Sequence, residues 1–216
     1  SFDVVANDFG AQPHDIRKDR IVLERHGAAL VEYLENGRID EAEALLAEPC
    51  CFDSVTQETQ NSALHLAAAL GLLEIIEALI VKACPINKQN ARGETPLHVA
   101  LQCGESKAAL LLLAFKADVT IRDNVGQTAI GLASCLAGDP DRKRLLQLIL
   151  AAGGDINSQD CNGMAPIHYI LQGDADIEIL KFLLENGANQ LKKNFPKNIS
   201  GKPRDARRNF GIRPVF

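Results

Sequence analysis

The sequence predicts an all-α repeat fold, a solenoid of stacked helix pairs, and three observations support this class. One short motif recurs four times at nearly constant spacing, and each copy is followed by a second apolar helical pattern. The 216 residues are 46% hydrophobic, but only 5% are aromatic and none is Trp. Leu and Ala therefore carry the apolar content, which suits short, closely packed helices better than a β-sandwich.

The clearest copy of the motif spans residues 90–100, Asn-Ala-Arg-Gly-Glu-Thr-Pro-Leu-His-Val-Ala. Gly93 can adopt the positive φ that a tight turn requires. Thr95 can cap a helix with its hydroxyl, and Pro96 fits the first helical position, where no N–H is missed. Leu97 then begins a buried helical face.

The His of the motif gives the spacing of the copies. His65 and His98 lie 33 residues apart, Gly131 replaces the His after another 33, and His168 follows 37 residues later. A period near 33 with this motif resembles the ankyrin repeat, in which a turn is followed by two helices. The extra residues before the last copy predict an insertion between the helices of the fourth unit, at residues 137–142, where the chain carries Gly and Pro.

The resemblance implies an L-shaped stack in which paired antiparallel helices form the body and β-hairpin loops project from it. Family members typically bind other proteins through the hairpin tips and the inner helices, and they share no catalytic activity. A rigid array with a concave face would lose little conformational freedom on binding.

The resemblance divides the chain into three parts. Residues 1–20 match no unit and are predicted to be an N-terminal arm or linker, residues 21–193 are the ankyrin-repeat domain, and residues 194–216 are a degenerate capping half repeat with a basic tail. The first unit lacks the Thr-Pro-Leu-His part, with helices expected over 28–34 and 39–47, and this divergence fits an N-terminal cap. The expected units are 21–56, 57–89, 90–122, 123–159 and 160–193.

Two further features concern the outer parts of the units. The apolar run from Leu110 to Leu113 is expected to be buried between neighbouring units rather than exposed. Asn87 and Asn157 end their units and are expected to cap loops by bonding nearby backbone. In animal cells, Asn at this ankyrin position can be hydroxylated, and this alternative stays open.

The contact surface that the resemblance implies falls on the tips and on the concave ends of the first helices. Val125 and Met164 are apolar residues expected at exposed tips, so they are the expected contact anchors. For each residue, solvent-exposed filler is the competing interpretation, because few interface residues dominate binding. The residues predicted to bind a partner are Glu58, Asn61, Arg92, Glu94, Gln102, Cys103, Asn124, Val125, Gln127, Asn162, Met164 and Gln172.

Nothing in the sequence indicates an enzyme. His65, His98 and His168 are expected to hydrogen-bond loop backbone between units rather than to bind a ligand. Cys103 and His98 are five residues apart on a short helix and so lie on different faces. With no Ser-His-Asp order, phosphate-binding loop or paired carboxylates, we expect no catalytic residue, no cofactor, no metal and no small-molecule substrate.

The six cysteines show no Cys-x-x-Cys spacing. We expect all six thiols to be reduced, as small apolar residues of an intracellular, cytoplasmic protein, with the nucleus as the alternative compartment. Cys84 falls where a buried Ala is usual. The adjacent pair Cys50 and Cys51 leaves metal binding or oxidation as an alternative without further support. No apolar run approaches a membrane span, and residues 1–25 show no secretory signal.

The C-terminal segment differs from the rest in charge. From residue 192 onward the chain contains eight Lys and Arg residues but a single Asp, although the whole chain has a net charge of −5. This tail either docks on the acidic body or solubilises the last unit, or it contacts an acidic protein segment, nucleic acid or a membrane surface. Few aromatic residues are interleaved, which disfavours base stacking. The basic residues of the tail are Lys197, Lys202, Arg204, Arg207, Arg208 and Arg213.

These observations predict a protein–protein interaction module, acting as an adaptor, inhibitor or scaffold, that is a monomer by itself and binds another protein. The alternative is a non-catalytic targeting or regulatory domain of a larger enzyme or effector. The sequence does not begin with Met, which indicates an excised or processed piece and favours that alternative.

Overall fold

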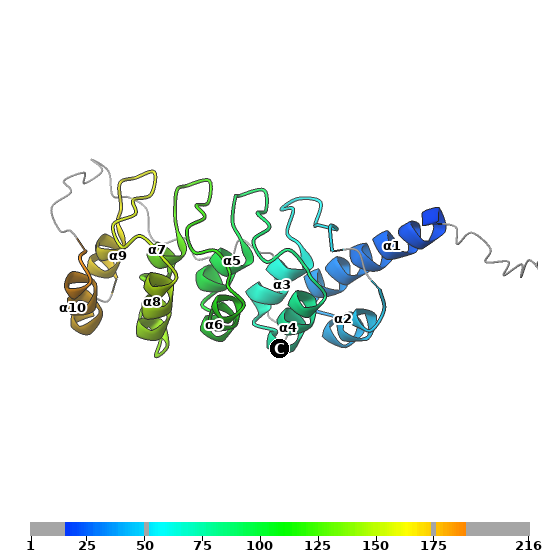
Figure 1. The fold of residues 1–216 in the computed structure, drawn as a ribbon, viewed down its shortest axis with the longest axis horizontal. Coiled ribbons are helices and arrows are strands. Elements are labelled where there is room, and N and C mark those ends of the chain that lie inside the picture. Colours follow the sequence, from blue (N-terminus) through cyan, green and yellow to red (C-terminus); the bar gives the residue numbers. More distant parts are fainter. Residues whose placement is uncertain (1–15, 50–51, 174–175, 189–216) are drawn as a thin grey trace, which may run out of the picture.

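The computed structural model describes residues 16–49, 52–173 and 176–188. In these residues the chain forms ten α-helices, stacked as five pairs in a single row (Figure 1). The predicted all-α repeat solenoid is confirmed. The helices are α1 (Ile16–Glu35), α2 (Ile39–Leu46), α3 (Ala63–Leu70), α4 (Leu73–Val81), α5 (Pro96–Cys103), α6 (Ser106–Ala114), α7 (Ala129–Ala133), α8 (Arg142–Ala151), α9 (Pro166–Gln172) and α10 (Ile177–Glu185).

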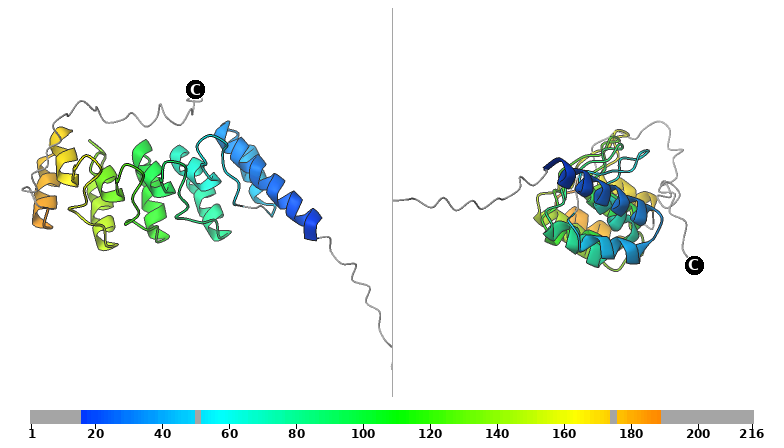
Figure 2. Two further views of the ribbon diagram at one scale, coloured as in Figure 1. Left: turned by 90° about the horizontal axis from the view of Figure 1, so that it is seen from above. Right: turned by 90° about the vertical axis from the view of Figure 1, so that its right-hand side faces the viewer.

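The two helices of each pair occupy different layers. In Figure 1, α3, α5, α7 and α9 lie next to the projecting loops, whereas α4, α6, α8 and α10 lie on the far side. Seen along the row, the loops project together on one side of the stack (Figure 2). The described loops contain no β-strand, only an isolated antiparallel bridge between Val55 and Ser62. The units therefore present one row of loops and, opposite to it, one layer of outer helices.

The motif builds the starts of α5 and α3 as predicted. In α5 the backbone N–H of His98 donates to Oγ1 of Thr95 (3.4 Å), and Pro96 occupies the first turn. Gly104 ends the helix at φ +77°, a left-handed conformation that Gly adopts without strain. Ser62 and Gly71 take the same places in α3. These two helices are therefore short, because the cap and the left-handed glycine of each lie only nine residues apart.

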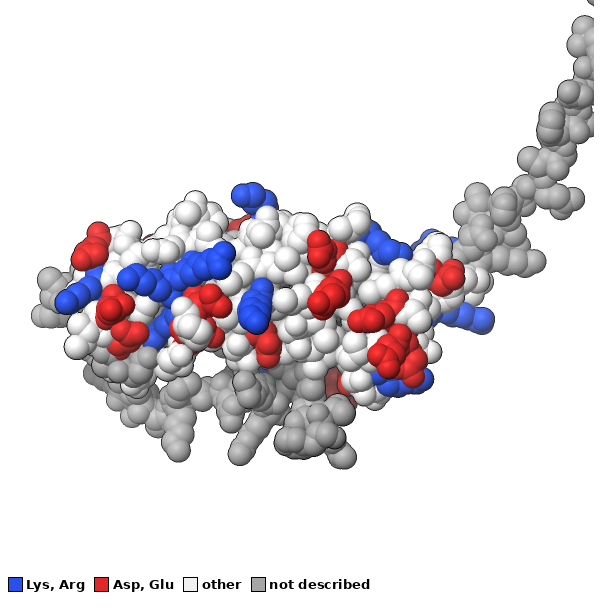
Figure 3. Space-filling view, turned by 90° about the horizontal axis from the view of Figure 1, so that it is seen from below, with Lys and Arg blue, Asp and Glu red and all other residues white. Residues whose placement is uncertain are grey.

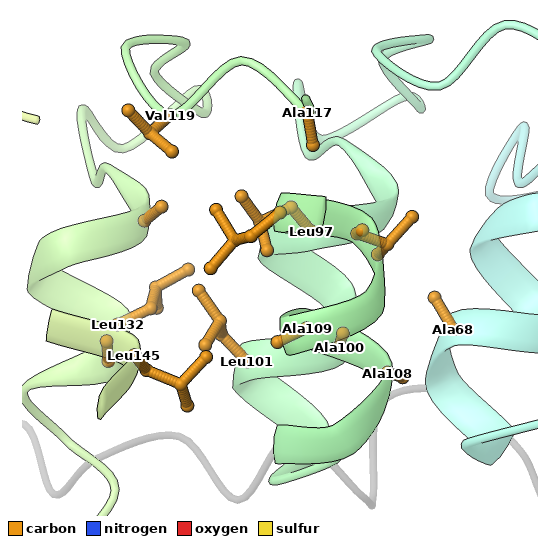
Figure 4. Packing of buried hydrophobic residues seen from close by; sticks show 14 of the residues in the cluster. Ala68, Leu97, Ala100, Leu101, Ala108, Ala109, Ala117, Val119, Leu132 and Leu145 are labelled. Atoms are coloured by element: carbon orange, nitrogen blue, oxygen red, sulfur yellow. The ribbon is translucent and has the colours of Figure 1, made fainter. Parts of the chain in front are cut away.

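Small and branched apolar residues form one continuous core along the stack. Figure 4 shows Leu101, Leu132 and Leu145 lying together between the helices of the third and fourth units. Ala100 and Ala108 are fully buried, and residues of this size let neighbouring helices approach closely. No unit buries its apolar faces alone, so each depends on its neighbours for a core.

The predicted insertion of the fourth unit lies between its two helices. The segment between Ala133 and Arg142 is a run of turns, and Arg142 is buried with its guanidinium donating to the carbonyl oxygen of Ser134. The hydroxyl of Ser106 on α6 donates to Asp139 Oδ2 (2.6 Å). The inserted turn is thus held at both ends, on the side of the stack away from the loops.

Two expectations about helices were wrong in detail. The first helix, expected over 28–34, begins at Ile16 and therefore crosses the boundary expected at residue 20. Residues 16–26 contain neither Gly nor Pro, so nothing in them stops a helix. In the apolar run of α6, Leu112 and Leu113 are buried but Leu110 and Leu111 are only half-buried. Four consecutive residues cover a whole helical turn, so some of them must face outward.

Two of the signature histidines bridge successive units, as predicted. The backbone N–H of Ser62 donates to His65 Nδ1 (3.1 Å), which places the ring proton on Nε2, and Nε2 donates to the carbonyl oxygen of Glu94 in the next unit (2.9 Å). His98 Nε2 reaches the carbonyl oxygen of Gln127 in the same way (3.3 Å). His168 Nδ1 accepts from the N–H of Ala165 (3.0 Å). The two bridging rings thus tie the second unit to the loop of the third, and the third unit to the loop of the fourth.

This bridge predicts a pH dependence of stability. Burial lowers the pKa of His65 from 6.5 to about 4, so below pH 6.5 the unfolded chain binds a proton that the folded chain does not. The free energy of unfolding should therefore fall as the pH falls from about 6.5 to 4, by about 3 kcal/mol for this residue. Urea unfolding at several pH values should show a weaker slope for His65→Gln. An NMR titration of native His65 with an ordinary midpoint near 6.5 would contradict the bridge.

Candidate functional site

The loops that project from the stack end in four tips, which together form the tip row: residues 56–61, 90–94, 123–127 and 160–164 (Figure 1). Three tips are closed identically. In the fourth unit, the N–H of Asp123 donates to the carbonyl oxygen of Gln127 (3.0 Å). The N–H of Gly126 donates to the carbonyl oxygen of Asp123 (2.9 Å). The same pair of bonds closes the tips that begin at Asn90 and Asp160.

The residue that begins each of these tips also organises it from inside. Asp123 Oδ1 accepts from the backbone N–H groups of Val125 (3.0 Å) and Gln127 (2.7 Å), and Oδ1 of Asn90 and Asp160 accepts two N–H groups in the same positions. Asn and Asp favour such turns because their short side chains reach backbone two residues on. Sequence reasoning missed these residues, although their spacing of 33 and 37 residues was a usable signal.

Backbone hydrogen bonds join each tip to the one before it. The N–H of Ala91 donates to the carbonyl oxygen of Thr59 (3.0 Å). In the same way, the N–H of Asn124 donates to the carbonyl oxygen of Arg92 (3.0 Å), and the N–H of Cys161 donates to the carbonyl oxygen of Val125 (2.8 Å). Gly93 lies close to the next tip, because a Cβ there would be 2.5 Å from Asn124 Oδ1. The tip row is therefore fixed in register, and its side chains stand at set intervals.

A buried polar network lies under the first and second tips of the row. Asn90 Nδ2 donates to Asn61 Oδ1 (2.8 Å) and to Glu94 Oε2 (2.9 Å), and Arg92 Nε lies 3.1 Å from the same Glu94 oxygen. Asn61 and Glu94 are both buried. The expectation that these two residues lie exposed at the tips was wrong, because the network needs their polar atoms inside.

Two other predicted contact residues are also buried. Met164 is only 7% exposed, and its sulfur accepts a long contact from Gln172 Nε2 (3.9 Å). Cys103 packs with Ala69 and Val99 in a small apolar cluster. Met164 is the last tip residue before the helix cap, where the chain already turns toward the core. The exposed anchor expected at Met164 is therefore absent from the tip row.

The remaining predicted residues are accessible. Arg92, Gln102 and Gln127 are half-buried, and Val125 is 37% exposed, which makes it the accessible apolar side chain of the third tip. The basic residues from Lys197 to Arg213 lie outside the described residues. The exposed residues of the predicted set are Glu58, Asn124, Val125, Asn162 and Gln172.

The fourth unit replaces the bridging His by a different contact, which sequence reasoning missed. The ring of Tyr169 from the next unit lies against Gly131, with Cε2 3.6 Å from where a Cβ would stand. Its hydroxyl donates to Asp160 Oδ2 (2.6 Å) and accepts from Gln127 Nε2 (2.9 Å). Burial and the bond to Asp160 raise the Tyr169 pKa. Tyr169 thus anchors two tips at once. The sequence feature that could have predicted this contact was Gly131 in place of the His of the motif.

The chemistry of the described residues is modest. Cys84 and Cys103 are buried, whereas Cys135 and Cys161 are exposed, and none of these four forms a disulfide within the described residues. Burial raises the pKa of Cys84 to about 11.

Within the described ranges, no group of three or more His, Cys, Asp or Glu is arranged to hold a metal ion. None of the helices described combines the length and the apolarity that a membrane span requires. Cys50 and Cys51 lie outside the described residues.

A row of identically built tips on a stack of helix pairs defines a repeat protein that presents loops along one edge. The ankyrin-repeat model for three copies matches residues 26–123, and the single-repeat model matches residues 162–195. The chain therefore belongs to the ankyrin-repeat family, as the motif predicted, and ankyrin repeats are in general protein–protein interaction modules. The fourth unit, with its Gly131 and its insertion, lies between the two matched spans.

Curated relatives are much longer than this chain. Rabankyrin-5 of Mus musculus is 31% identical over 127 residues, which cover 58% of this chain and 10% of that protein. Neurogenic locus notch homolog protein 1 of Mus musculus is 29% identical over 140 residues, which cover 64% of this chain and 5% of that protein. The chain thus matches a tenth or less of the length of these relatives.

The Tyr169 contact can be tested against the other tyrosine of the chain. Tyr169→Phe keeps the ring over Gly131 but leaves Asp160 Oδ2 and Gln127 Nε2 without their shared partner. The free energy of unfolding should fall by about 1–2 kcal/mol, measured by urea denaturation. Tyr33→Phe is the matched control, because the ring under Arg38 is retained there. Equal small effects of both changes would show that the hydroxyl of Tyr169 does not anchor the tips.

Proposed function

We propose that this chain is an adaptor, inhibitor or scaffold module that binds a partner protein through the exposed side chains of the tip row and the adjacent ends of the first helices. The observation that carries the proposal is the set of backbone bonds between successive tips. These bonds hold the tips before any partner arrives, so binding loses little conformational entropy.

The third and fourth units carry the most suitable contact residues. Val125 offers an exposed apolar side chain, and Arg92 on the neighbouring tip is partly exposed with its guanidinium held by Glu94. Arg is frequent among residues that dominate interfaces, and a held guanidinium has less freedom to lose. A partner with an apolar side chain facing Val125 and an acidic or carbonyl group facing Arg92 fits this arrangement.

A second candidate is that the same surface serves as a targeting or regulatory module of a larger protein. The small share of each curated relative that the chain matches supports this candidate, since the matched span is a tenth or less of a much longer chain there. The two candidates agree on the binding surface and on the absence of catalysis by these repeats. With either candidate we propose that the protein lies inside the cell. We also propose, as a separate point, that the basic tail contacts an acidic surface.

The tip row is tested by one substitution and a matched control. Val125→Glu places a charge where an apolar contact is proposed, whereas Val22→Glu makes the same change on α1, at a side chain that is 48% exposed. Proteins retained from a cell extract by the immobilised wild-type chain should be retained by Val22→Glu and lost by Val125→Glu. The affinity for the main retained protein should fall about 30-fold.

Circular dichroism should show the same helical content for both variants, since both side chains lie outside the core. If Val125→Glu binds as the wild type does, the tip row is not the contact surface. Loss of binding in Val22→Glu alone would instead place the contact on the first helix.

A further inference from the structure

The layer of outer helices carries an open groove on the side of the stack away from the tips. We call this the outer groove; it lies between α4 and α6 and reaches α8. Its floor is apolar and consists of Leu73, Leu110, Leu111 and Ala114. The three leucines are half-buried and Ala114 is exposed. An apolar floor therefore faces solvent in the middle of the outer layer.

The floor is unusual for the outward face of a surface helix. From position 110 to the end of α6 the sequence is Leu-Leu-Leu-Leu-Ala, so no polar side chain is available to face water there. On α4 and α8 most outward positions are charged, as at Glu74, Glu77, Lys143 and Arg144, although Val81 and Leu148 are exposed as well. Leu112 and Leu113 are buried, whereas Leu110 and Leu111 pack against the core with only part of their surface and leave the rest open to solvent.

The rim of the groove has opposite charges at its two ends. Glu74 and Glu77 stand on α4, whereas Lys107 on α6 and Arg144 on α8 stand toward the other end, and all four are exposed. In Figure 3 acidic side chains gather over the end of the stack with α2 and α4, and a band of Lys and Arg crosses toward α8 and α10, where acidic side chains are present as well. None of these four side chains forms an ion pair within the described parts of the chain.

An apolar floor between unpaired charges of opposite sign is complementary to a particular kind of ligand. We propose that the outer groove binds an amphipathic helix of a partner protein, with basic residues over α4 and acidic residues over Lys107 and Arg144. Neighbouring helices pack about 10 Å apart, so the distance from the axis of α4 to the axis of α8 is about 20 Å. A helix of about 13 residues has this length. Its apolar stripe would cover the leucines.

The charge pattern favours this occupant over the basic tail of the chain itself. That tail carries eight basic residues and one acid from position 192 onward, so Lys107 and Arg144 would repel it. The outer groove and the tip row lie on opposite sides of the stack, so one module can hold two partners. This goes beyond binding through the tips, and it supplies a physical basis for a scaffold.

Three synthetic helical peptides with the same leucine stripe test the proposal on the full chain. One peptide has Lys at one end and Glu at the other, the second has Lys at both ends, and the third has Glu at both ends. Fluorescence anisotropy should show the first peptide binding at least tenfold more tightly than the other two, with a preference that weakens at high salt.

Reversing one end of the groove should change which peptide is preferred. Glu74→Lys with Glu77→Lys makes the whole rim basic, and this variant should prefer the peptide with Glu at both ends. Glu58→Lys, a reversal of the same sign on the tip row, should keep the wild-type preference. Val125→Glu should also leave peptide binding unchanged, so failure of the tip row and failure of the outer groove are separate results.

Three results would overturn the proposal. The first is that no peptide binds or that all three bind alike. The second is that the reversed variant keeps the wild-type preference although its circular dichroism is unchanged. The third is a wild-type dimer in sedimentation that the Glu74 and Glu77 reversal dissociates, which would make a second copy of the chain the occupant.

Discussion

The backbone hydrogen bond between successive tips is the constraint on which the rest of the structure depends. It joins Ala91 to Thr59, Asn124 to Arg92 and Cys161 to Val125, so each tip must stand at the same height above its helices as the one before it. A change in the length of a unit would break this register. The extra residues of the fourth unit are instead accommodated between its two helices, where Arg142 and Asp139 hold them on the opposite side. The insertion therefore lengthens the chain without displacing a tip.

Polar bridges between units repeat along the stack, but they are not chemically identical. His65 and His98 each donate from Nε2 to a carbonyl oxygen of the next tip, while Gly131 leaves the corresponding place empty and Tyr169 fills it from the following unit. Each solution satisfies polar groups that stacking would otherwise bury without partners. A polar bridge between neighbouring units is thus kept at this place, although both the residue that makes it and the groups that it bonds change.

The sequence predicted the turn, the cap and both helices of a unit, because Gly93, Thr95 and Pro96 act through local backbone chemistry. It could not predict that Glu94 and Met164 face inward, since that direction depends on the neighbouring tip. Tyr169 was missed for a related reason, as its role exists only because Gly131 lies in the preceding unit. The early start of α1 was missed because those residues match no motif. Leu110 and Leu111 show that an apolar run does not reveal which of its members the neighbouring units cover.

The two surfaces of the stack follow from the same register. The tips gain rigidity from bonds between neighbours, whereas the outer groove arises because α4, α6 and α8 are held side by side with their outward faces aligned (Figure 1). Binding at either surface then requires little rearrangement of the backbone. This account places the binding-competent state in the free protein.

Amide hydrogen exchange of the free chain tests that claim most directly. The N–H groups of Ala91, Asn124 and Cys161 donate between tips, so they should be protected from exchange although they lie in surface loops. Their protection should fall together with that of the helices when denaturant is added. Exchange of these three amides at the rate of an unstructured peptide, while the helices stay protected, would show that the tips are not held in register before binding.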